Sequence, residues 1–317
     1  MAYNPDHQIE RLTTAAAPVQ PEDSMAEAGR KILLAELMKM LRHEGGSRTG
    51  ENIEDVHDMR VATRRMRSAI RLLKPYFKAK DIRAFNRDLR RLAWVLGDVR
   101  DLDVMIEQLR QYQAGLEADR QAALQAVIDE LDRRRLIARE ELNAHLDSKA
   151  YRRFVKSFTE FLTQPVPDVK PAHDADATPF QVRHVLPLLI SERLAAVRAY
   201  ETILADAEPK TLHALRIEFK RLRYVLSLFQ EVLGAQAGEV IEEIKTIQDH
   251  LGHLNDSTVA RARLEGLVND ETSALNEYLT FLETQEIGLR DGFPVEWRRF
   301  NSRKVQQKLA TAVLALH

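Results

Sequence analysis

The chain contains the same sequence segment twice, and this internal repeat strongly limits the folds that it can adopt. The first copy, HDMRVATRRMR, begins at His57, and the second, HALRIEFKRLR, begins at His213. Both follow the pattern His-x-x-Arg-x-x-x-Arg/Lys-Arg-x-Arg. A Leu-Gly pair and an aspartate follow each copy at nearly the same distance, as LGDVRD and as LGHLND. A third similarity joins YRRF, from Tyr151, to WRRF, from Trp297. Three matches in the same order indicate a duplication.

Two proline-containing stretches suggest where the repeated units begin and end. Residues 1–24 hold three prolines and little periodicity, which is typical of a disordered arm. Residues 165–179 hold four prolines among scattered acidic residues, which is typical of a linker. The sequence therefore predicts one unit over residues 25–164 and a second over residues 180–317.

The residue pattern within each unit favours helices. The chain has 12 glycines and 11 prolines, and no run of alternating polar and apolar residues predicts a strand. We expect helices near residues 25–44, 53–77, 80–113 and 117–163, and near 181–206, 209–233, 237–268 and 271–315. The prediction is an all-α fold of two tandem four-helix bundles.

Each repeated segment forms a basic stripe when it is placed on a helix with about 100° per residue. Apolar residues occupy the opposite face of the helix, which is expected to be buried. The first stripe contains His57, Arg60, Arg64, Arg67 and Arg71. The second contains His213, Arg216, Lys220 and Arg223. Like charges three and four residues apart destabilise an isolated helix, so carboxylates of a neighbouring helix or a polyanionic ligand should offset the repulsion.

Arginines on successive turns present planar donor groups about 5.4 Å apart along the helix. Such groups can bind phosphate oxygens with two hydrogen bonds each. The histidines could donate to the same oxygens or bond locally near the start of their helices. In the next expected helix of the first copy, three cations share a face: Arg83, Arg87 and Arg90. Only the Arg90 position is basic in the second copy, where it is Lys245.

Other residues of the repeats allow two interpretations each. Asp101 and Asp256 could be general bases, but a structural role, in pairing with arginine or bonding to the backbone, is favoured because a carboxylate would repel phosphate. The two glycines of the Leu-Gly pairs are expected to permit close helix approach. Four aromatic residues are expected in the core or at helix contacts: Trp94, Tyr151, Phe154 and Trp297. Four arginines could line a groove or flank the bundles: Arg152, Arg153, Arg298 and Arg299.

Composition narrows the possible functions. The chain has no cysteine, which excludes disulfides and thiolate metal sites, and its net charge of −1 requires any anion site to be a local concentration of cations. One histidine per motif argues against a metal site. We find no phosphate-binding loop and no carboxylate cluster for magnesium, so neither an enzyme nor a cofactor is predicted. Without a run of about 20 apolar residues, the predicted location is cytoplasmic.

The two motifs, each followed by its Leu-Gly pair and aspartate, resemble the CHAD family, the conserved histidine α-helical domain. The similarity extends over roughly residues 25 to 315. It implies two four-helix bundles related by internal pseudo-two-fold symmetry, which bind inorganic polyphosphate in a basic groove and occur with polyphosphate granules. Some relatives join this domain to a triphosphatase domain with a Glu-x-Glu-x-Lys motif. That motif is absent here, so the resemblance implies no catalytic activity.

By this resemblance, the residues of both motifs are expected to contact polyphosphate. The first copy contributes His57, Arg60, Arg64, Arg65, Arg67 and Arg71. The second copy contributes His213, Arg216, Lys220, Arg221 and Arg223. Arg90 and Lys245 extend the set from the following helix. Ser227 stands at the position that corresponds to Arg71, so the second stripe is expected to be shorter than the first. The alternatives are a nucleic-acid-binding protein and a helical adaptor for an acidic partner.

Overall fold

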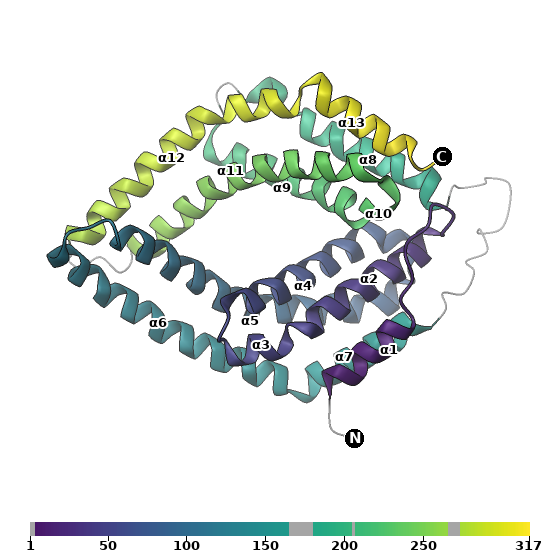
Figure 1. Cartoon of the computed structure of the whole chain (residues 1–317), viewed down its shortest axis with the longest axis horizontal. Helices are drawn as coiled ribbons and strands as arrows, with labels where there is room; N and C mark the ends of the chain where they lie inside the picture. Colours follow the sequence, from purple (N-terminus) through teal and green to yellow (C-terminus); the bar gives the residue numbers. More distant parts are fainter. Residues whose placement is uncertain (1–3, 165–179, 205–206, 266–272) are drawn as a thin grey trace. The chain divides into compact units, whose positions relative to one another are not determined.

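The computed structural model describes residues 4–164, 180–204, 207–265 and 273–317. Over these ranges the chain is all-α, as predicted (Figure 1). The β-type backbone pairing in these ranges is one isolated antiparallel bridge between Ser24 and Gln181. The predicted linker, 165–179, lies outside the described residues. The chain divides into two compact units, one of Met1–Gln111 with Ala126–Val182 and one of Tyr112–Gln125 with Arg183–His317.

Seven α-helices lie mainly in the first unit. They are α1 (Pro5–Thr14), α2 (Met25–Arg42), α3 (Glu44–Thr49), α4 (Ile53–Leu73), α5 (Ala79–Gln113), α6 (Ala118–Asp147) and α7 (Lys149–Thr163). A short 3-10 helix, Lys74–Tyr76, follows α4. Helix α2 packs along α4 and also contacts α7. Phe85 of α5 stacks on Phe158 of α7 with ring centroids 4.5 Å apart, which joins these helices in one core.

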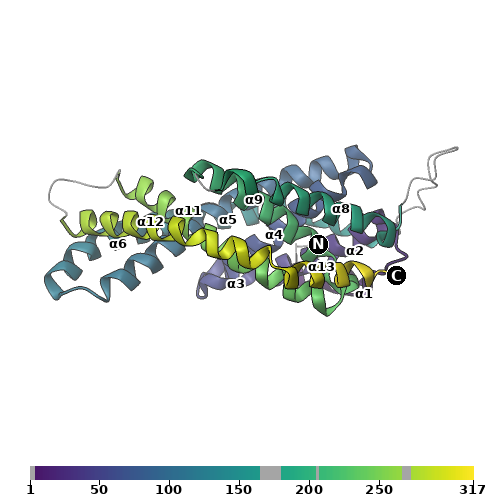
Figure 2. The same ribbon diagram turned by 90° about the horizontal axis from the view of Figure 1, so that it is seen from above.

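The remaining helices belong to the second unit, apart from Val182 at the start of α8. They are α8 (Val182–Arg198), α9 (Pro209–Leu228), α10 (Gln230–Leu233), α11 (Ala235–Glu265), α12 (Ser273–Phe300) and α13 (Arg303–Leu314), with a 3-10 helix at Glu201–Ile203. Helix α11 contacts α9, α12 and α13. Helices α12 and α13 follow one another with a break between them (Figure 2). Phe219 and Phe300 meet edge to face inside this unit, with centroids 5.0 Å apart.

The expectation of a disordered arm is wrong for residues 4–24. Helix α1 begins after Asn4, whose side chain accepts a hydrogen bond from Asp6 N at 2.8 Å. Leu12 and Val19 are buried, and α1 contacts α2 and α7. A ten-residue helix is marginal by itself, so these tertiary contacts stabilise it.

The last helix predicted for each copy is in fact two helices. Ser148 separates α6 from α7, and its hydroxyl accepts from Tyr151 N at 3.1 Å. Ser302 separates α12 from α13 and accepts from Val305 N at 3.5 Å. A helix that begins with such a serine cap has one fewer unsatisfied N–H group at its start.

These breaks correct the third sequence similarity. YRRF lies in α7, after the first break, whereas WRRF ends α12, before the second break. The two segments are therefore not equivalent positions. Ser148 and Ser302 are 154 residues apart, close to the separation of 156 between His57 and His213, so the serine caps are the corresponding features.

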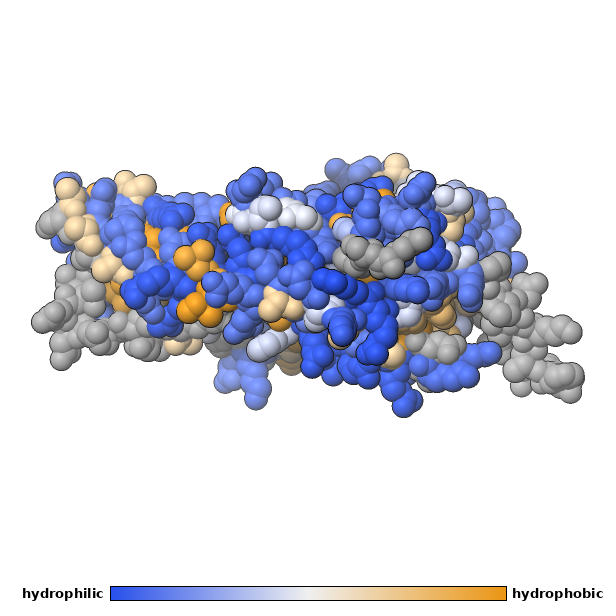
Figure 3. Space-filling model, turned by 90° about the horizontal axis from the view of Figure 1, so that it is seen from below, coloured by the Kyte–Doolittle hydropathy of each residue, from blue (hydrophilic) through white to orange (hydrophobic). Residues whose placement is uncertain are grey.

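The molecular surface is mainly hydrophilic in the view of Figure 3, where apolar residues form small separate patches. Exposed apolar side chains include Leu136 and Ile137 on α6. Single exposed apolar residues of this kind are ordinary on folded proteins.

Candidate functional site

The predicted buried face of α4 is confirmed. Its apolar side chains Met59, Ala62, Met66, Ala69, Ile70 and Leu73 are buried. The basic stripe lies on the other face, where Arg71 is exposed and the side chains from His57 to Arg67 are partly exposed. Helix α9 has the same organisation, with Leu215, Leu222 and Phe229 buried and His213 exposed. The alternation of buried and exposed sides therefore follows directly from the helical spacing.

Contacts with α5 fix the position of the stripe in the first unit. Arg60 Nη2 lies 3.7 Å from Asp101 Oδ1, and a Cβ atom added to Gly97 would lie 3.9 Å from Arg60 Nε. Arg100 Nη1 lies 3.4 Å from Glu54 Oε1, one helical turn before His57. Helices α4 and α5 therefore run antiparallel, with Arg60 level with Gly97.

The same arrangement recurs in the second unit, between α9 and α11. His213 Nδ1 lies 2.9 Å from Asn255 Oδ1, and a Cβ atom on Gly252 would lie 4.0 Å from Arg216 Nη2. Beyond the end of α9, a Cβ atom on Gly238 of α11 would lie 3.2 Å from Nε2 of Gln230, the first residue of α10. All these contacts belong to a single antiparallel register.

The surroundings of the Leu-Gly pairs do not support the predicted close helix approach. The atom nearest to each absent Cβ is an arginine side-chain nitrogen, at 3.9 Å from Gly97 and 4.0 Å from Gly252, and not the backbone of a neighbouring helix. Both distances are ordinary van der Waals separations, so a Cβ atom would fit at either position beside the guanidinium group of the first arginine in the stripe. Asp101 lies beside Arg60, in agreement with the structural pairing that was favoured. Asp256 accepts from the amide of Asn255 at 3.3 Å.

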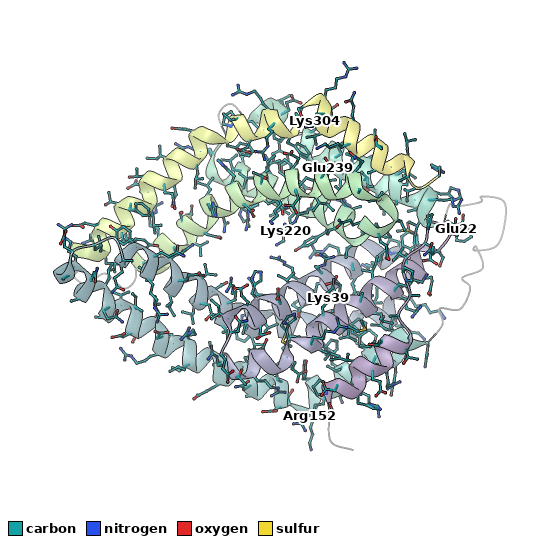
Figure 4. The ribbon with its side chains drawn as sticks, viewed as in Figure 1. Glu22, Lys39, Arg152, Lys220, Glu239 and Lys304 are labelled. Atoms are coloured by element: carbon teal, nitrogen blue, oxygen red, sulfur yellow. The ribbon has the colours of Figure 1, made fainter. Side chains whose placement is uncertain are left out.

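Some predicted ligand residues already have carboxylate partners inside the protein. Arg65 Nε lies 2.9 Å from Oε1 of Glu36, a side chain of α2 that is only 3% exposed and that also binds Lys39. Arg221 pairs with Glu218 on its own helix. Lys245 lies 3.8 Å from Glu242. Figure 4 shows Lys39 on α2 and Lys220 on α9.

Other stripe cations keep part of their surface exposed to solvent. Within the described ranges, no carboxylate lies in ion-pair distance of Arg71, Arg90 or Arg216. Arg71 and Arg90 are exposed, and Arg216 is partly exposed. Lys220 and Arg223 of α9 and Arg64 and Arg67 of α4 are also partly exposed. The stripes therefore keep positive charge accessible to solvent in both units.

The two histidines occupy equivalent positions, the fifth residues of α4 and α9. His213 bonds across to α11, so its partner is not in its own helix. Burial lowers the pKa of His57 from its ordinary value, and the nearby charge of Arg100 lowers it further. The neutral imidazole is therefore favoured in the folded protein. An anion placed beside it would favour the protonated form instead.

One aromatic residue was misjudged from the sequence. Tyr151, Phe154 and Trp297 are buried, as expected, but Trp94 is 65% exposed. On α5, Trp94 is three residues before Gly97 and shares its helical face, which brings it level with Arg64 of α4. Aromatic residues pack in cores so often that composition gave no signal for this placement. Arg152, Arg153, Arg298 and Arg299 are all exposed.

Two kinds of feature are absent from the described residues. Histidine, aspartate and glutamate side chains form no group of three or more that could hold a metal ion there. None of the helices in that part of the chain has a stretch long and apolar enough for a membrane span.

The sequence comparison with protein families decides the classification. The family description "CHAD domain" matches residues 31–265, most of the chain. The chain belongs to the CHAD domain family. Two curated relatives, the uncharacterized proteins MT2285 and Rv2226 of Mycobacterium tuberculosis strains, are 26% identical over 211 residues. The match covers 66% of this chain but only 39% of each relative.

Solved structures agree with this classification at the level of the fold. The CHAD domain from the plant Ricinus communis is similar with a TM-score of 0.66 and 21% identity, over 93% of this chain and 94% of that one. PptA from Streptomyces chartreusis is similar with a TM-score of 0.62 and 15% identity, over 87% of this chain and 100% of that one. At these identities the likeness concerns the all-α fold and not the ligand.

Proposed function

We propose that this CHAD protein binds inorganic polyphosphate through the α4 and α9 stripes, without catalysing a reaction. The observation that carries the proposal is the recurrence of one arrangement in both units. In each, the first arginine of the stripe, Arg60 or Arg216, lies next to the glycine of the Leu-Gly pair on the antiparallel helix, α5 or α11, and neighbouring cations of the stripe remain at least partly exposed. Because both copies of the duplicated unit keep this arrangement, we expect both units to bind the same kind of ligand.

The chemistry of the stripes fits a chain of phosphates. Guanidinium groups at successive turns are about 5.4 Å apart, and each can donate two hydrogen bonds to phosphate oxygens. Binding of this kind depends on the charge and spacing of the phosphates and needs no contact with a base or sugar. We infer that the protein associates with polyphosphate in the cytoplasm, including granules of that polymer.

Three of the predicted ligand residues, Arg65, Arg221 and Lys245, lie within 4 Å of glutamates and are expected to contribute mainly to local structure. Arg60 lies 3.7 Å from Asp101 but belongs to the arrangement that recurs in both units, so it is kept among the proposed contacts. The others remain the proposed contacts. They are His57, Arg60, Arg64, Arg67, Arg71, Arg90, His213, Arg216, Lys220 and Arg223.

A charge-matched pair of variants tests the proposal. The stripe variant replaces Arg64, Arg67, Lys220 and Arg223 with glutamine. The control variant makes the same substitution at four exposed cations outside the stripes: Lys149, Lys156, Arg303 and Lys304. Both lose four charges, so a loss of binding to immobilised long-chain polyphosphate only in the stripe variant identifies the stripes. Equal binding by the two variants, with helical circular dichroism retained, would refute the assignment.

Competition experiments separate polyphosphate from the other candidate ligands. Polyphosphate should displace DNA and RNA from the protein, and its affinity should fall steeply with salt. Stronger binding of nucleic acid, or of an acidic polypeptide, would replace the proposal with one of those ligands. Release of phosphate from polyphosphate in the presence of magnesium would show that the protein is an enzyme.

A further inference from the structure

Helix α5 carries its own row of cations on the face that meets the α4 stripe. Arg83, Arg87 and Arg90 are separated by four and three residues, and the same spacing continues through Trp94 to Gly97. Residues at such intervals share one side of a helix. Because Gly97 lies against Arg60, that side of α5 is the side next to the α4 stripe.

The antiparallel register places the two rows opposite one another. Seven residues after Arg60 on α4 is Arg67, and seven residues before Gly97 on α5 is Arg90, so these two arginines are level. One turn further, Arg71 is level with Arg87. Near the turn between the helices, Lys74 is level with Arg83. The end of the first unit near this turn therefore carries cations on both helices.

These four residues, Arg71, Lys74, Arg83 and Arg87, are exposed. Arg87 Nε is 3.1 Å from Oδ1 of Asp88, the adjacent residue. Among the residues that the structure describes, the other three have no ion-pair partner. Cations near the end of α4 are favoured by the helix dipole, but cations near the start of α5 are disfavoured by it. Helix stability alone therefore does not account for Arg83.

The corresponding end of the second unit has no such concentration of charge. Ser227 and Glu242 stand where the first unit has Arg71 and Arg87, and Gln230 and Gly238 stand where it has Lys74 and Arg83. The contact between Gln230 and Gly238 confirms that this pair is level in the second unit. Four cations in one unit thus correspond to one acid and three uncharged residues in the other.

We propose that Arg71, Lys74, Arg83 and Arg87 form an additional phosphate-binding subsite that only the first unit possesses. The inference rests on the proposed function and adds a preference for chain length. From Arg67 to Lys74 the stripe continues for about 10 Å along the helix axis. A longer polyphosphate can place further phosphates along this extension, whereas a short chain is held by the part common to both units.

Affinity measured against chain length tests the subsite. The variant R83Q/R87Q removes two α5 cations that lie outside both repeated motifs. The matched control K149Q/K156Q removes two exposed cations of α7 in the same unit. Dissociation constants are measured for tripolyphosphate and for a series of longer polyphosphates, with circular dichroism as the check on folding.

R83Q/R87Q should weaken the binding of long chains by about tenfold or more. The slope of log affinity against log salt concentration should become shallower by the amount expected for the loss of about two phosphate contacts. Its affinity should also stop increasing at a shorter chain length than that of the wild type and of the control. An unchanged length dependence would refute the subsite while the stripes remain the binding site. If the wild type bound polyphosphate of no length, the proposed function itself would fail.

Discussion

At the scale of single residues, the position of His57 combines structure and electrostatics. It is the fifth residue of α4, close enough to Arg100 of α5 for that charge to lower its pKa. The helical spacing predicted that His57 and the arginines share a face, because that depends only on periodicity. The influence of Arg100, and the carboxylate of Glu36 that holds Arg65, come from other helices and could not be read from the spacing.

The lowered pKa of His57 predicts how stability depends on pH. The unfolded chain takes up a proton near the ordinary value of 6.5, whereas the folded chain takes it up only at lower pH. Unfolding is therefore favoured as pH falls below about 6.5, until the folded form is protonated as well. His57→Gln should reduce this loss of stability, measured by urea denaturation across that pH range.

Polyphosphate should reverse the shift, since an anion favours the protonated imidazole. NMR titration of the His57 ring is expected to give a pKa below 6.5 in the free protein and a higher pKa in the complex. Binding should then strengthen as pH falls. A pKa that polyphosphate leaves unchanged would show that His57 lies away from the ligand, whatever the role of the arginines.

At the scale of helices, the sequence predicted most elements but not the breaks near their ends. The apolar spacing on both sides of Ser148 is helical, and one serine inside a helical pattern is not a strong stop signal. Ser148 and Ser302 are N-caps, and these caps show the repeat more clearly than the segments YRRF and WRRF do. Helix α1 was missed because its stability depends on α2 and α7.

Removing the cap at Ser148 should destabilise α7. Ser148→Ala leaves Tyr151 N without its hydroxyl acceptor, at an expected cost of about 1 kcal/mol. Hydrogen exchange of the first amides of α7 should become faster. Ser148→Asp should retain protection because aspartate is also a good N-cap. Equal exchange in the alanine and aspartate variants would mean that the cap does not stabilise the helix.

At the scale of the whole chain, the second compact unit includes one segment that precedes the sequence boundary at residues 165–179. Tyr112–Gln125, the end of α5 and the start of α6, belongs to the second unit although it lies within the first repeat. Tyr112 packs on Tyr278 and Phe281 of α12, with ring centroids 4.7 and 5.2 Å away. Proline content identifies candidate linkers, but it cannot show that the tip of a helical pair packs with the other unit.

This packing predicts where a substitution at Tyr112 acts. Tyr112→Ala removes both aromatic contacts and should destabilise the second unit by about 1 to 3 kcal/mol. Hydrogen exchange should accelerate around Tyr278 in α12. It should remain unchanged in α2, although α2 belongs to the same sequence repeat as Tyr112. Tyr112→Phe keeps the ring and should preserve protection. Faster exchange in α2 than in α12 would instead assign residues 112–125 to the first unit. The boundary between the two units would then coincide with the boundary between the two sequence repeats.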